Sequence, residues 1–110
     1  MATTYKILGQ SAPASTANAD LITVGASKSQ IISTLVICNT TTSDATARVF
    51  ARIAGAAAAA SNAVIYDVVI PAKGRYSFTD GMSLAATDVI TVQTGTSNAL
   101  TFTAFGTEIA

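Results

Sequence analysis

The chain has 110 residues, of which half are apolar and only 11% are charged, and its six basic and six acidic side chains cancel at neutral pH. An average globular protein carries about 25% charged residues. Zero net charge argues against nucleic acid or an anionic membrane as a partner, and the high apolar content excludes intrinsic disorder. We therefore expect a single folded domain over residues 1–110, soluble and made in a cytoplasm. Its surface is expected to be covered by small apolar and hydroxyl side chains or by another protein.

Apolar alternation and turn residues predict a series of short strands, and no segment keeps the 3.6-residue period of a helix for three turns. The expected strands, in chain order, are 4–8, 21–24, 30–39, 45–54, 63–70, 76–79, 88–94 and 100–105. Seven or eight short strands without helical crossovers favour an all-β fold, a single antiparallel β-sandwich or jelly-roll-like domain. Because few strand formers follow Gly9, we expect residues 1–20 to include an extended N-terminal arm.

The strand at 30–39 is the richest in apolar residues and has them on both faces, with Ile31, Leu35 and Ile37 on one side. This pattern predicts a central strand that is covered on both sides. The expected core of the sandwich comprises Ile7, Ile22, Ile32, Leu35, Ile37, Val49, Ile65, Val68, Ile70, Val89, Val92 and Phe102.

The sequence offers little for catalysis or metal binding, because it has no histidine and a single cysteine, Cys38. Histidine is the commonest general base and metal ligand. Cys38 has no basic residue near it in sequence to favour the thiolate, so we expect it to be buried as a small apolar side chain. The six carboxylates are scattered without the spacing of a calcium loop. The sequence therefore predicts no catalytic residue, no metal, no cofactor and no enzymatic activity.

The sharpest local feature is the series Arg48, Phe50 and Arg52, which alternate along the strand at 45–54 and so share one face. An aromatic between two guanidinium groups is typical of a protein interface and of a platform that stacks single-stranded nucleic acid. Zero net charge disfavours nucleic acid as the partner. The three residues then either form an interface with another protein or are simply exposed to solvent, and we predict the interface. The alanine-rich loop at 55–62 is interpreted in the same two ways, with contact to a neighbouring subunit slightly favoured.

Several segments resemble one known group of proteins. These are Ala2–Ala14 (ATTYKILGQSAPA), Ala19–Val24 (ADLITV), Ser33–Asn39, Leu84–Val92 (LAATDVITV) and Phe102–Ile109 (FTAFGTEI). Together they span nearly the whole chain and resemble the small virion structural proteins of tailed bacteriophages, cyanophages among them. One departure is Gln93, where similar sequences often carry an aromatic residue.

The resemblance implies a non-enzymatic part of the virion and carries over no functional residues. Its first interpretation is a capsid cement, or decoration, protein that binds the outer shell as a homo-oligomer, with a trimer favoured. The partner is then the major capsid protein or another virion protein, with no nucleic acid and no membrane. The alternative is a tail-fibre or baseplate subunit with receptor or glycan contact. A third hypothesis is a carbohydrate-binding module that uses exposed aromatics among Tyr5, Tyr66, Tyr76 and Phe50.

Overall fold

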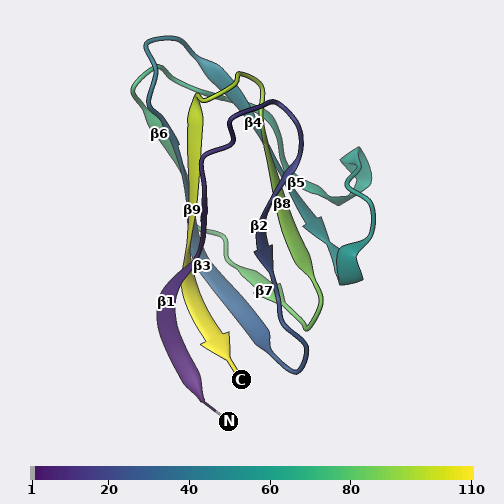
Figure 1. Cartoon of the computed structure of the whole chain (residues 1–110). Helices are drawn as coiled ribbons and strands as arrows, with labels where there is room; N and C mark the ends of the chain where they lie inside the picture. Colours follow the sequence, from purple (N-terminus) through teal and green to yellow (C-terminus); the bar gives the residue numbers. More distant parts are fainter. Residues whose placement is uncertain (1) are drawn as a thin grey trace.

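Two antiparallel sheets face one another in the computed structural model of the chain, which describes residues 2–110 (Figure 1). The strands are β1 (Thr3–Ser11), β2 (Ala19–Thr23), β3 (Ser29–Asn39), β4 (Ala45–Arg52), β5 (Ala63–Ile70), β6 (Arg75–Phe78), β7 (Met82–Leu84), β8 (Val89–Thr94) and β9 (Leu100–Ile109). Two single turns of 3₁₀ helix, η1 (Ile53–Gly55) and η2 (Ala60–Asn62), lie between β4 and β5. The predicted all-β antiparallel sandwich is confirmed. The three-residue β7 was not predicted, because it is too short to show a period of two.

The five-stranded sheet has the order β1-β9-β3-β6, with β7 pairing on the same side of β3 as β6, and the four-stranded sheet has the order β2-β8-β4-β5. The two ends of the chain are therefore neighbours, since β1 pairs antiparallel with β9 along its length. Within the predicted N-terminal arm, residues 3–11 form the edge strand β1 and residues 12–18 connect it to β2. The segment after Ser11 thus crosses from one sheet to the other.

The core lies between the sheets and contains most of the predicted residues, among them Leu35, Ile37 and Phe102, which are fully buried. Ile7 was expected there and is instead 55% exposed. A bulge explains the difference, because Ile7 pairs with Phe105 and Gly9 with Ala104, which leaves Leu8 as an extra residue in β1. Leu8 packs against the core in place of Ile7.

A second bulge corrects the predicted faces of β3. Ile32 pairs with Gly106 and Thr34 with Phe105, so Ser33 is an extra residue that reverses the alternation. Ile32 therefore points inward with Leu35 and Ile37, whereas Ile31 points outward and is exposed. β3 is central in its sheet as predicted, but the expectation that both faces are covered is wrong for residues 2–110.

The strand expected at 45–54 is shorter in the structure, because β4 ends at Arg52. Ile53 begins η1, and the next residue, Ala54, has a left-handed backbone conformation with φ of 52°. This turn takes Ile53 out of the strand in which it was expected and leaves it largely exposed.

Candidate interaction surfaces

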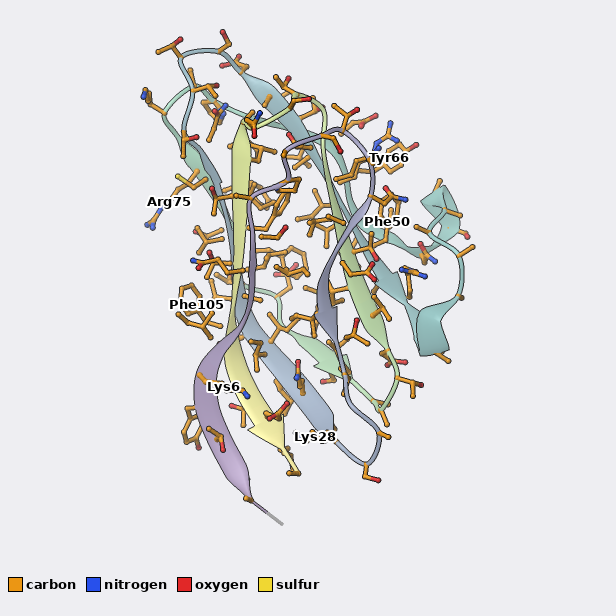
Figure 2. The ribbon with its side chains drawn as sticks, viewed as in Figure 1. Lys6, Lys28, Phe50, Tyr66, Arg75 and Phe105 are labelled. Carbon is orange, nitrogen blue, oxygen red and sulfur yellow. The ribbon has the colours of Figure 1, made fainter. Side chains whose placement is uncertain are left out.

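The predicted Arg48, Phe50 and Arg52 series lies on the outer face of the four-stranded sheet. The three residues pair in regular register with Gln93, Thr91 and Val89 of β8, so they do share one face. Phe50 is only 4% exposed even though it lies outside the core between the sheets. Its ring meets that of Tyr66 edge to face, with centroids 6.5 Å apart (Figure 2). The phenyl group is thus covered by its own chain.

Arg48 is engaged by a carboxylate and an aromatic ring of β5. Its Nε and Nη2 donate to the two carboxylate oxygens of Asp67, at 2.6 and 3.1 Å. Its guanidinium carbon lies 4.2 Å from the centre of the Tyr66 ring, within the range of a cation–π contact. The hydrogen bond from Arg48 lowers the pKa of the Asp67 carboxyl below its usual value. Two-point pairing of this kind fixes the orientation of the guanidinium group.

Arg52 holds the alanine-rich loop against the sheet. Its Nε donates to the carbonyl of Ala56 at 2.6 Å, and its Nη2 donates to the carbonyl of Gly55 at 3.0 Å. Its Nη1 donates to Asp20 Oδ1 and Thr91 Oγ1, at 3.2 and 2.9 Å. One guanidinium group therefore joins the loop to strands β2 and β8.

The loop after β4 has two further attachments of its own. Asp88 accepts hydrogen bonds from the amides of Ala54 and Ala85, at 3.0 and 2.9 Å, and these two bonds lower the pKa of its carboxyl. Asn62 donates to the carbonyl of Ala57 and accepts from the amide of Ala59. The loop is thus ordered by contacts within the chain. The interface role of Arg48, Phe50 and Arg52 stays a prediction.

A second surface, which we call the outer apolar face, lies on the five-stranded sheet away from the core. It comprises Tyr5, Ile7, Ile31 and Phe105, all exposed large apolar side chains. The register places Tyr5 and Ile31 on either side of Thr107, and Ile7 beside Phe105. A shallow depression on this face is lined in part by Tyr5, Ile7 and Phe105. Figure 2 shows Phe105 pointing away from the interior of the sandwich.

Sequence reasoning missed this face because it assigned Ile7 to the core and could not place the bulges. One signal was present, since Tyr5 and Ile7 alternate with Thr4 and Lys6 along the first strand. That alternation predicts two different faces. It does not say which of the two faces meets the other sheet.

On the inner side of the same sheet, Glu108 gathers two lysines and a glutamine. Lys6 Nζ lies 3.0 Å and Lys28 Nζ 3.8 Å from Glu108 Oε1, and Gln30 Nε2 donates to Oε2 at 2.9 Å. The hydrogen bonds from Gln30 and then Lys6 are the main causes that lower the pKa of the Glu108 carboxyl. Lys6 and Lys28 both point to this side of the sheet (Figure 2). The positive charge of β1 is therefore balanced within the chain.

Chemistry-bearing side chains do not gather elsewhere in the described chain. Residues 2–110 contain no group of three or more histidine, cysteine, aspartate or glutamate side chains able to hold a metal ion. Cys38 is half-buried and pairs in register with Arg75, so the expectation of a fully buried thiol is wrong. In the part that the structure describes, no helix has the length and apolar character needed to span a membrane.

Comparison of the chain with family models, with curated proteins and with solved structures finds no significant match.

The three carboxyls with lowered pKa values predict how stability depends on pH. A carboxyl whose pKa is lower in the folded than in the unfolded state stabilises the fold above its unfolded pKa, about 3.9 for Asp and 4.3 for Glu. That contribution is lost as the pH falls through the folded pKa. We expect the urea midpoint to be nearly constant from pH 8 to pH 5, because the chain has no histidine, and to fall below about pH 4.

Asp88 provides the control for this pH dependence, because its two acceptor bonds come from backbone amides. Asp88→Asn should lower the midpoint at pH 7 and make the loss between pH 5 and pH 3 smaller than in the wild type. A midpoint that rises on acidification would contradict the assignment of these carboxyls as stabilising.

Proposed function

We propose that this chain is a non-enzymatic structural protein of a phage virion, and specifically a capsid cement protein that binds the outer shell as an oligomer and stabilises it. The observation that carries the proposal is the outer apolar face, which leaves Tyr5 83% exposed in a chain with only 11% charged residues. Contiguous exposed apolar side chains mark surfaces that bind other proteins. The sequence resemblance to small virion proteins of tailed phages supports the same function.

Binding to an assembled shell stabilises it by mass action. A protein that binds the assembled state and not the dissociated one contributes RT ln(1 + [L]/Kd) per site, about 2.7 kcal/mol when its free concentration is 100 times Kd. Each bound copy contributes little by itself, and the contributions of the many sites on one shell add up. The three-fold sites of an icosahedral shell favour a trimer. The free edge of strand β1 favours a pair.

Particles stripped of this protein should lose resistance to heat and osmotic shock. We expect them to release their genome at a lower temperature than complete particles, as followed by a dye that binds the released nucleic acid. Adding back the purified protein should restore the original temperature, and an unrelated protein of similar size should not. Stripped particles that are as resistant as complete ones would remove the stabilising role.

The number of copies per particle distinguishes a protein of the shell from a protein of the tail. Hundreds of copies per particle, from quantified protein bands, favour the shell, and a few dozen or fewer favour a tail-fibre or baseplate subunit. The carbohydrate-binding hypothesis stays a prediction, and the two most exposed tyrosines that it names, Tyr5 and Tyr66, lie on different sheets. Phe50 is covered, Tyr66 lies under Arg48 on one sheet, and Tyr5 lies on the opposite face of the other.

A further inference from the structure

Three of the four sheet edges are interrupted along most of their length, whereas the bulge of β1 at Leu8 leaves the run 3–7 regular. The β5 edge contains a bulge at Asp67, whose φ is 56°. The edge opposite β1 is divided into β6 and β7, strands of four and three residues. The β2 edge has five residues, with a register shift between Asp20 and Ile22. Short strands and bulges are the usual means by which sheets prevent edge-to-edge association.

The edge formed by β1 is different. Residues 3–7 pair in unbroken register with β9, and within residues 2–110 no strand lies on their other side (Figure 1). Ala2 and Ala110 exchange both of their backbone hydrogen bonds, at 3.2 and 2.9 Å. Because bonded and non-bonded pairs alternate in an antiparallel ladder, Thr4 and Lys6 bond β9. The N–H and C=O groups of Thr3, Tyr5 and Ile7 therefore face the free edge.

The same strand also carries half of the outer apolar face. Tyr5 and Ile7 lie directly beside the free edge, and Phe105 and Ile31 continue the apolar surface inward across the sheet. With about 150–250 Å² for a whole aromatic side chain, the exposed parts of these four side chains amount to roughly 400 Å². A stable interface needs about 800 Å² on each partner. Because side chains on a sheet face point away from the sheet, edge-to-edge pairing covers only Tyr5 and Ile7 of these four, so the contact is smaller than this area and the backbone hydrogen bonds of residues 3, 5 and 7 carry the pairing.

We propose that a second copy of this chain occupies this edge, with the two β1 strands paired antiparallel about a two-fold axis at Tyr5. Thr3 of each copy then lies opposite Ile7 of the other, and the two Tyr5 residues face each other. All the free N–H and C=O groups of residues 3, 5 and 7 find partners in this register. The β1 edge is then the contact surface of the oligomer in the proposed function, and this inference rests on that function.

Charge and aromatic pairing favour a copy of the same chain at this edge. Lys6 is the only charged residue in the run 3–7, and its ammonium group is already paired with Glu108 on the inner face. None of the four residues of the outer apolar face is charged, so two copies meet without like-charge repulsion. Two tyrosines directly opposite one another form a favourable cross-strand aromatic pair. Since the other edges are interrupted, β1 pairs best with another β1.

Light scattering and sedimentation of the purified full-length chain test the pairing directly. We expect the wild type to dimerise as its concentration is raised, with a dissociation constant below about 1 mM, and Ile7→Lys to raise the dissociation constant by at least about 100-fold. Val69→Lys is the matched control, because Val69 is 56% exposed, against 55% for Ile7, but lies on β5 of the other sheet. That variant should remain a dimer. Thr3→Pro should also weaken the dimer, because it removes an N–H from the free edge without changing the apolar face.

Circular dichroism and thermal unfolding establish that each variant is folded. A wild type that is monomeric at every concentration, or trimeric, would overturn the two-fold pairing. So would an Ile7→Lys variant that dimerises as well as the wild type, or a Val69→Lys variant that dissociates as readily as Ile7→Lys. The particle experiment is independent of these measurements. A monomer that still protects particles from heat overturns the pairing alone, and a dimer that has no effect on particles overturns the cement function alone.

Discussion

Replacing Gly106 with alanine is expected to lower the free energy of unfolding by about 3 kcal/mol. Gly106 lies in β9 between Lys6 of β1 and Ile32 of β3, where the backbones approach closely. A Cβ atom at this position would overlap the carbonyl oxygen of Ile31 and lie 3.0 Å from the Cα of Ile32. Both are backbone atoms beside the Ser33 bulge, so the strands must separate to make room.

The cost is a large part of the stability of a small domain, which is about 5–15 kcal/mol in total. For a chain of this size it corresponds to a fall in Tm of roughly 10 °C or more. Urea unfolding and thermal scans measure both quantities. The same substitution also shifts the backbone that carries Ile31 and Phe105, so the arrangement of the side chains on the outer apolar face should change.

Gly25→Ala is the matched control, because it makes the same chemical change and has the same effect on the unfolded chain. A Cβ on Gly25 would contact only the flexible side chain of Lys28, at 3.5 Å. Its backbone φ is not positive, so alanine is tolerated. We expect its unfolding free energy to stay within about 0.5 kcal/mol of the wild type. If both variants unfold alike, the close approach at Gly106 is not what limits stability.

Arg52→Ala is expected to release the alanine-rich loop and to cost about 2 kcal/mol, since hydrogen bonds to charged groups contribute about 1.5–3 kcal/mol each and some are replaced by water. The variant loses the hydrogen bonds to the carbonyls of Gly55 and Ala56 and those to Asp20 and Thr91. Hydrogen exchange in residues 53–62 should become faster, and an elastase-type protease, which prefers small side chains, should cut there.

Arg48→Ala provides the comparison on the same face of the same strand. Arg48 pairs with one carboxylate at the surface, and exposed ion pairs contribute little to stability. We expect this variant to unfold nearly as the wild type does and to keep the loop protected from protease. Arg52→Lys should behave like Arg52→Ala for the loop, because a single ammonium group does not reproduce the fork that holds two carbonyls and a carboxylate. Equal protease sensitivity of wild type and Arg52→Ala would contradict this role for Arg52.

These internal contacts change how the predicted interface is tested. Arg52 attaches the loop to the sheet and Phe50 is buried against Tyr66, so a double replacement by alanine alters the fold locally as well as any contact with a partner. Ile7 and Tyr5 are the better probes of association, since their side chains project from the domain. A loss of association after Ile7→Lys would therefore reflect the lost contact, because this substitution leaves the core unchanged.

The sequence predicts the all-β sandwich, and most of the core residues predicted from it are buried between the sheets. Alternation along strands such as the one expected at 45–54 and the turn residues between strands depend on local chemistry, and burial follows from that alternation. The shared face of Arg48, Phe50 and Arg52 was predicted for the same reason and is confirmed by the register with β8.

Which faces of the strands are exposed depends on how distant strands pair. The bulges at Leu8 and Ser33 each add one residue, which moves Ile7 and Ile31 from the expected faces to the outer apolar face. Nothing in the local pattern marks them, because a bulge is set by how a strand pairs with its distant partner. The free edge of β1 and the internal partners of Arg48 and Arg52 likewise depend on which strands meet. Pairing between β1 and β9 joins the two ends of the chain, and no short-range pattern encodes such a contact.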